Sequence, residues 1–127
     1  MGRALLICLA GAVGTGARYG AGLASVRLFG AGIPWGTFFV NVAGSLLLAA
    51  IAVLGGAGGS LSPTARLVLG TGFCGGFTTY SAFNQETLTY LQDGAVGRAV
   101  LYVLATVVAC LLAGLAGWGL TSWAVAR

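Results

Sequence analysis

The sequence predicts an all-α membrane protein that forms one domain over residues 1–127 and contains four transmembrane helices. Two observations predict this class. Of the 127 residues, 58% are hydrophobic and only 6% are charged, whereas soluble proteins carry about 25% charged residues. Apolar runs close to the roughly 20 residues that cross a hydrocarbon core also recur along the chain. The predicted spans cover residues 4–25, 36–54, 65–90 and 96–124, and the expected location is the cell (plasma or inner) membrane.

The first span is predicted to be a retained helix rather than a signal peptide, because it lacks a clear cleavage site and carries Arg18. Small residues recur in it at every fourth position, at Ala12, Gly16, Gly20 and Ala24. Such a row lets helix backbones approach closely in lipid. The contact would lie either within one chain or between two copies.

Gly, Pro, Ser and Asp mark the connections between the spans. FGAGIP precedes the second span, GGAGGSLSP follows it, and QDGAVG separates the third span from the fourth. Pro63 suits the first position of a helix, with Ser62 as its N-cap. The third span is therefore expected to begin close to Pro63.

The arginines give almost no orientation signal. With four spans both termini lie on one side, so Arg3, Arg66 and Arg127 face one compartment, while Arg27, Arg98 and the deeper Arg18 face the other. Orientation normally follows an excess of Lys and Arg in cytoplasmic loops, and this chain has no Lys. We expect dual topology and an antiparallel homodimer; a related partner chain that fixes the orientation is the alternative.

Polar residues form rows at helical spacing in two spans. Thr37, Asn41 and Ser45 share one face of the second span. The Asn41 amide can donate two hydrogen bonds without adding a charge, which suits an anion that must be desolvated and then released. A hydrogen bond that only holds two helices together is the alternative. A weaker row in the fourth span contains Tyr102, Thr106 and Cys110.

The third span combines aromatic and polar side chains. Tyr80 and Phe83 share a helix face, directly after Thr78 and Thr79. An aromatic ring is positive at its edge and negative on its face, so the edge can stabilise an anion and the face attracts a cation. This segment is therefore a candidate ion-binding region.

Three glycines, Gly72, Gly75 and Gly76, are predicted to break the third span near its middle. Non-helical backbone at membrane depth is tolerated only where protein, water or an ion satisfies its polar groups. If two antiparallel copies cross at their breaks, converging carbonyl oxygens could hold a small cation on the dimer axis.

The residues that are absent exclude other functions. Glu86 and Asp93 are the only acidic residues, and there is no His, so a proton relay has almost no groups to use. The chain contains neither a nucleophile paired with a base nor a phosphate-binding loop. An enzyme and an ATP-driven pump are not expected, nor is a nucleic-acid partner, which leaves passive conduction.

These motifs resemble the Fluc (CrcB) fluoride channels, small four-helix proteins that export fluoride passively. The likeness covers nearly the whole chain and rests on three stretches: GAVGTGARYG at 11–20, GTFFVNVAGS at 36–45 and GFCGGFTTYSAFNQE at 72–86. The resemblance implies an antiparallel, dual-topology homodimer with two fluoride pores, each lined by both subunits. It also implies a structural sodium ion at the centre.

The resemblance also implies roles for individual residues. Asn41 resembles the pore-lining amide, while Tyr80 and Phe83 match the fluoride-coordinating aromatic pair. Gly75 and Thr78 match the positions whose carbonyl oxygens ligate sodium. The other residues expected in the fluoride pore are Ser81, Thr79, Tyr102, Thr37, the first-helix arginine Arg18, and Glu86 at the end of the third-span signature.

Three positions depart from the usual family pattern. Tyr80 stands where Phe is common, Ala82 where Thr is common, and Asn84 where Ser is common. The Tyr80 hydroxyl would either crowd the aromatic pair or donate a hydrogen bond to the ion, and Ala82 removes one hydroxyl. Conduction is expected to survive at an altered rate.

Two other classes fit the sequence less well. A transporter similar to the small multidrug exporters needs an acidic residue deep in its first helix; residues 4–25 contain none, and Glu86 is a poor substitute. A non-conducting assembly or anchoring protein would explain the glycine-rich rows, but it would leave the polar groupings of the other spans unexplained.

Overall fold

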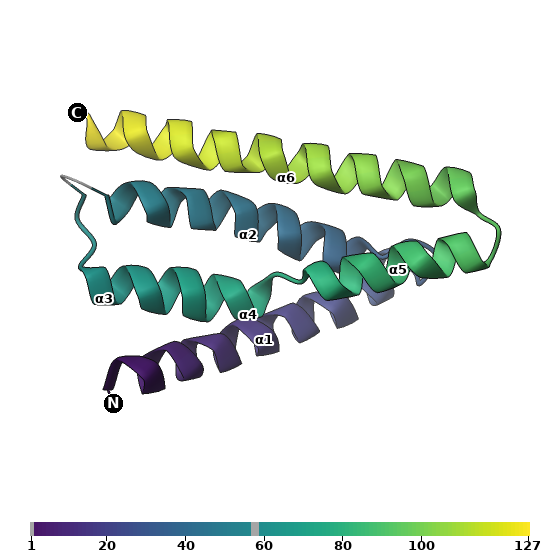
Figure 1. Ribbon diagram of the computed structural model, residues 1–127, viewed down its shortest axis with the longest axis horizontal. Coiled ribbons are helices and arrows are strands. Elements are labelled where there is room, and N and C mark those ends of the chain that lie inside the picture. Colours follow the sequence, from purple (N-terminus) through teal and green to yellow (C-terminus); the bar gives the residue numbers. More distant parts are fainter. Residues whose placement is uncertain (1, 57–58) are drawn as a thin grey trace.

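The computed structural model describes residues 2–56 and 59–127. Within these residues the regular secondary structure is all helical (Figure 1), as the composition predicts. In chain order the elements are α1 (Gly2–Phe29), α2 (Trp35–Leu54), α3 (Pro63–Arg66), the π-helical segment η1 (Leu67–Cys74), α4 (Gly75–Phe77), α5 (Tyr80–Gln92) and α6 (Val96–Val125).

Three of these helices, α1, α2 and α6, are long and apolar enough to cross a membrane. The segment from α3 to α5 is divided into shorter helices, yet it lies along the other three helices, and the two termini lie at the same end of the molecule (Figure 1). The core lies where α2 packs against α6 and where α1 packs against η1 and α4. The chain is thus a helical bundle with one interrupted member.

The helix boundaries follow local chemistry. Helix α1 ends at Phe29 because Gly30 adopts a φ of +77°, a conformation that favours glycine at a helix C-terminus. At the start of α3, Ser62 Oγ accepts a hydrogen bond from the Ala65 N–H at 3.1 Å, and Pro63 occupies the first helical position. The predicted helix start at Pro63 is therefore confirmed.

The glycines predicted to break the third span lie in helical backbone instead. Gly75, for example, has φ −62° and ψ −36°. At two of the three positions the small size serves close packing: a Cβ on Gly72 would lie 2.8 Å from the Ile7 carbonyl oxygen, and one on Gly76 would overlap the Gly11 carbonyl. The predicted position of the break is thus wrong. Gly72 and Gly76 bring this segment against α1.

The backbone leaves helical geometry two residues further on. Thr78 has φ −86° and ψ 160°, and Thr79 has φ −153° and ψ 110°, so both residues are extended. Two successive β-branched residues suit this conformation better than a helix interior. Thr78 and Thr79 therefore form the interruption between α4 and α5.

The small-residue row of the first span does not pack within the chain. Ala12, Gly16, Gly20 and Ala24 are all exposed, and a Cβ on Gly16 or Gly20 would meet no atom within 4 Å. Helix α1 instead uses Gly14, which is buried against the Phe73 carbonyl. Of the two contacts considered for this row, the one within a single chain is therefore wrong.

Candidate ion-binding site

The side chain of Asn41 on α2 stabilises the extended backbone of Thr79 at the interruption. Asn41 Oδ1 accepts a hydrogen bond from the Thr79 N–H at 2.7 Å, and Asn41 Nδ2 donates to the Thr79 carbonyl oxygen at 3.1 Å. One side-chain amide thereby satisfies both backbone groups of an extended residue that is only 8% exposed. Because unpaired backbone is costly at membrane depth, this pairing explains an Asn in an apolar helix. One N–H of the amide remains for another acceptor.

The threonine hydroxyls complete the interruption. Thr79 Oγ1 accepts from the Ala82 N–H at 3.1 Å and so caps α5, and it shares a second hydrogen bond with Ser81 Oγ at 3.2 Å. Thr78 Oγ1 donates back to the Cys74 carbonyl oxygen at 2.9 Å. Each hydroxyl thus stabilises one end of the break.

The carbonyl oxygens of Gly75 and Thr78 are among those that lose their helical partners at the interruption. In a continuous helix, the Thr79 N–H would donate to the Gly75 carbonyl and the Ala82 N–H to the Thr78 carbonyl. Both N–H groups are engaged elsewhere, with Asn41 and with the Thr79 hydroxyl. Carbonyl oxygens without amide partners suit a small hard cation such as sodium. The residues at this break therefore fit the ion that the resemblance implies.

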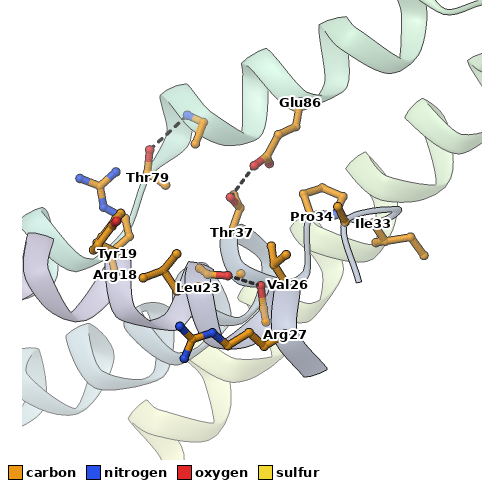
Figure 2. A pocket seen from close by; sticks show the side chains of 15 residues that line it. Arg18, Tyr19, Leu23, Val26, Arg27, Ile33, Pro34, Thr37, Thr79 and Glu86 are labelled. Carbon is orange, nitrogen blue, oxygen red and sulfur yellow. Dashed lines mark hydrogen bonds between the residues drawn. The ribbon is translucent and has the colours of Figure 1, made fainter. Parts of the chain in front are cut away.

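Arg18 contacts the same segment from α1. Its Nε donates to the Gly76 carbonyl oxygen at 3.1 Å, beside a longer 3.5 Å hydrogen bond from Thr15 Oγ1. Arg18 also lines an open pocket of about 620 Å³, together with Thr37, Thr79 and Glu86 (Figure 2). This pocket brings the arginine predicted for the pore to the same space as three of the predicted polar groups.

Glu86 connects three helices. Its Oε1 accepts from the Thr37 hydroxyl at 2.6 Å, drawn in Figure 2, and its Oε2 accepts from the Tyr102 hydroxyl at 2.7 Å. Thr37 lies on α2, Glu86 on α5 and Tyr102 on α6. Each carboxyl oxygen therefore holds one hydroxyl, and the three side chains fix the position of α5 between its neighbours.

The two rings of the predicted aromatic pair differ in exposure. Phe83 is 8% exposed and packs on Tyr102, with ring centroids 5.3 Å apart, whereas Tyr80 is 78% exposed. The Tyr80 and Phe83 centroids lie 5.8 Å apart. Phe83 therefore belongs to the core of this chain, while Tyr80 presents most of its surface outward.

A second pocket, of about 360 Å³, lies beside these rings. Asn41, Thr78, Tyr80, Phe83 and Thr106 are among the residues that line it, and none of its lining side chains is charged. Thr106 Oγ1 is fully buried and has no hydrogen-bond partner within the described residues. Leaving such a group unpaired costs about 1–3 kcal/mol. The pocket is therefore lined by residues with neutral polar groups, one of which has a buried hydroxyl without a partner among the described residues.

The predicted site residues thus fall into two groups, which the Asn41–Thr79 pair connects. Arg18, Thr37, Thr79 and Glu86 line the larger pocket, and Asn41, Tyr80, Phe83 and Thr78 line the smaller one. Ser81 is exposed beside Thr79, Gly75 lies exposed on α4, and Tyr102 joins the two groups through Glu86 and Phe83. Thr106 was not among the predicted pore residues; its place in the row of Tyr102 and Cys110 was the signal that could have identified it.

These features define a multi-pass helical membrane protein in which polar side chains converge on an interrupted helix. The model of the family described as CrcB-like protein, Camphor Resistance (CrcB), matches residues 5–118. The protein therefore belongs to the CrcB family, and the resemblance read from its motifs is confirmed.

Relatives named "Fluoride-specific ion channel FluC" are similar over almost the full chain. The relative from Anaeromyxobacter sp. (strain K) is 48% identical over 123 residues, which cover 97% of this chain and 98% of the relative. That from Sorangium cellulosum is 47% identical over 117 residues, or 92% of each chain. One from Thermus thermophilus is 44% identical over 120 residues, or 94% of this chain and 95% of the relative. These relatives are named as channels, not as enzymes.

Proposed function

We propose that this protein is a fluoride-selective passive channel that exports fluoride from the cell. The observation that carries the proposal is the uncharged pocket of about 360 Å³ beside Asn41, in which Thr106 has a buried hydroxyl without a partner among the described residues. Its family relatives named as fluoride-specific channels support the same conclusion.

The chemistry of the pocket suits fluoride. Fluoride is a strong hydrogen-bond acceptor that holds its water tightly, so its dehydration must be offset by several donors. Asn41, Thr106 and Tyr80 line the pocket and carry neutral N–H and O–H donors, and ring edges supply partial positive charge. Because none of these groups is charged, the ion can leave as well as enter.

Arg18 gives the larger pocket a positive group with which to attract anions. It shares that pocket with Thr37 and Glu86, so the Glu86 carboxyl, held by two hydroxyls, limits how strongly an anion is retained there. An anion would pass from this pocket to the smaller one by crossing the Asn41–Thr79 pair.

Passive conduction gives a cellular benefit without an energy source. Hydrogen fluoride is a weak acid that crosses membranes in its neutral form and dissociates inside the cell. A leak for the anion, driven outward by the membrane potential, lowers the internal load.

The functional unit in this proposal is an antiparallel, dual-topology homodimer with two pores in the lipid bilayer. The segment from α3 to α5 acts as a fourth span, since it lies along the three long helices (Figure 1). Tyr80 is 78% exposed within a polar segment, and Gly75 is exposed with no atom within 4 Å of a Cβ placed there. A second copy would cover both residues, and the balanced arginines support two orientations.

A structural sodium ion would occupy the centre of that dimer. The Gly75 and Thr78 carbonyl oxygens of both copies would hold it, because their usual amide partners are engaged elsewhere. When bound, the ion supplies a positive charge that neutralises converging carbonyl dipoles and so stabilises two interruptions placed side by side.

Fluoride efflux from liposomes that contain an Asn41→Asp variant tests the assignment of the pore. The carboxylate adds a negative charge and removes the N–H donor, so fluoride efflux should be strongly suppressed. Gln92→Glu is the matched control, because it makes the same amide-to-carboxylate change at an exposed residue at the end of α5 that lines neither pocket. Equal fluoride efflux from the two variants would remove Asn41 from the ion path.

A further inference from the structure

The Asn41 side chain determines which hydrogen bond the Thr79 N–H makes. Of the two hydrogen bonds in the Asn41–Thr79 pair, the one from the Thr79 N–H to Oδ1 is the shorter, at 2.7 Å against 3.1 Å. Asn41 lies within the continuous helix α2, where Ser45 Oγ donates to its backbone carbonyl at 2.7 Å. The amide is therefore a fixed partner for an extended residue.

The alternative partner of the Thr79 N–H is the Gly75 carbonyl oxygen. These two groups are four residues apart, the spacing of an α-helical hydrogen bond. Residues 75–77 are already helical, so one further turn would bring the pair together and remove the Gly75 carbonyl from the exposed surface. Asn41 prevents this turn by occupying the N–H.

The Thr78 carbonyl depends on the same arrangement. Its helical partner would be the Ala82 N–H, which instead donates to Thr79 Oγ1 at 3.1 Å. Thr79 can cap α5 in this way only in its extended conformation, with ψ at 110°. Since Asn41 holds Thr79 extended, one side chain keeps both carbonyl oxygens free of amide partners.

We infer that Asn41 is a positioning residue for the cation site as well as a donor to the anion. The inference rests on the proposed function. Asn41 acts on the cation through Thr79 and the two carbonyl oxygens, without touching the ion, and the same residue lines the uncharged pocket. The anion path and the cation site thus share one side chain. Its Oδ1 holds the Thr79 backbone that shapes the cation site, and its remaining N–H donates to the anion.

The inference is tested by the dependence of thermal unfolding on sodium concentration. Purified protein in detergent is unfolded at increasing sodium, with N-methylglucamine keeping the ionic strength constant, to obtain a half-saturating sodium concentration. Asn41→Leu keeps the side-chain size but loses both hydrogen bonds. Asn41→Asp keeps an oxygen that can accept from the Thr79 N–H. Thr37→Val is the matched control, because Thr37 bonds Glu86 from the preceding turn of α2.

The expected result separates the two functions of Asn41. Asn41→Leu should raise the half-saturating sodium concentration at least roughly tenfold, the usual effect of losing a group that positions metal ligands. Asn41→Asp should lose fluoride efflux yet keep a wild-type sodium response, and Thr37→Val should also keep it. If Asn41→Leu does not fold, Asn41→Ser serves in its place, since its shorter side chain cannot span to Thr79.

Each contrary outcome identifies a different error. A wild-type protein whose unfolding is the same in sodium and in N-methylglucamine would contradict the proposed sodium site itself. A sodium-responsive wild type accompanied by an equally responsive Asn41→Leu or Asn41→Ser variant would overturn the inference about Asn41 alone. Loss of the sodium response in Asn41→Asp, which retains the acceptor oxygen, would also overturn it.

Discussion

Arg18 on α1 donates from Nε to the carbonyl oxygen of Gly76 at 3.1 Å, across 58 positions of the chain. In a continuous helix that carbonyl would accept from the N–H of Tyr80, but the extended residues between α4 and α5 remove this partner. A charged side chain within a membrane-spanning helix is costly unless it is paired. Arg18 therefore supplies the hydrogen bond that the Gly76 carbonyl loses at the interruption, and the carbonyl gives the charge of Arg18 a partner.

Arg18→Lys should destabilise the protein although it keeps the charge. Lysine lacks the Nε–H that reaches Gly76, so we expect the free energy of unfolding to fall by about 1.5–3 kcal/mol, the usual value for a hydrogen bond to a charged group. Unfolding by SDS in mixed micelles measures the change. Arg27→Lys, at an exposed position of the same helix, should have little effect, and equal stabilities of the two variants would contradict this function of Arg18.

Two neighbouring glycines of α6 should respond oppositely to alanine. A Cβ on Gly117 would overlap the Leu46 carbonyl of α2, whereas one on Gly119 would meet no atom within 4 Å. Gly117→Ala should therefore cost about 1–3 kcal/mol of stability, and Gly119→Ala should be neutral or stabilising by up to about 1 kcal/mol. The same SDS titration compares them. A tolerated Gly117→Ala would contradict the close packing of α2 against α6.

Tyr102→Phe should reduce fluoride efflux while leaving the ring packing on Phe83 in place. The variant loses the hydroxyl that donates to Glu86 Oε2 at 2.7 Å. If the energy of one such bond appears in the barrier to conduction, efflux falls by roughly tenfold. Tyr90→Phe is the control, since its hydroxyl bonds the Gly32 carbonyl at the surface. Equal rates in the two variants would exclude the Tyr102–Glu86 bond from the ion path.

Gly75→Cys should form a disulfide between two copies of the chain. A residue beside a two-fold axis meets its own equivalent, and Gly75 is exposed on α4 with open space around it. The experiment uses a background in which the three native cysteines are replaced, with Gly97→Cys at the start of α6 as control. Cross-linking in membranes at residue 97 but not at residue 75 would contradict a dimer that crosses at the interruption.

The sequence allowed the helices to be predicted closely, because their boundaries depend on local signals. The second and fourth predicted spans differ from α2 and α6 by one residue, and Ser62 with Pro63 correctly marked the start of α3. The position of the break could not be predicted in the same way. Glycine both weakens a helix and permits close packing, and only the tertiary contact with α1 shows that packing decides here.

The sequence predicted which residues belong to the candidate site, but it did not predict which of them form hydrogen bonds with one another. The row of Thr37, Asn41 and Ser45 was visible from its spacing. The partners of Glu86 were not, because its two hydroxyl donors lie 49 and 16 positions away and no local pattern joins them. The capping function of Thr79 depends on the same kind of distant contact, with Asn41 on α2.

The most direct measurement is the efflux of fluoride and chloride from liposomes that contain only this protein, followed with ion-selective electrodes. Passive anion conduction carries charge, so release requires a potassium ionophore to carry a compensating cation. The proposed function predicts rapid, ionophore-dependent release of fluoride while chloride is retained. Equal release of both halides, or no fluoride release from correctly folded protein, would contradict a fluoride-selective channel.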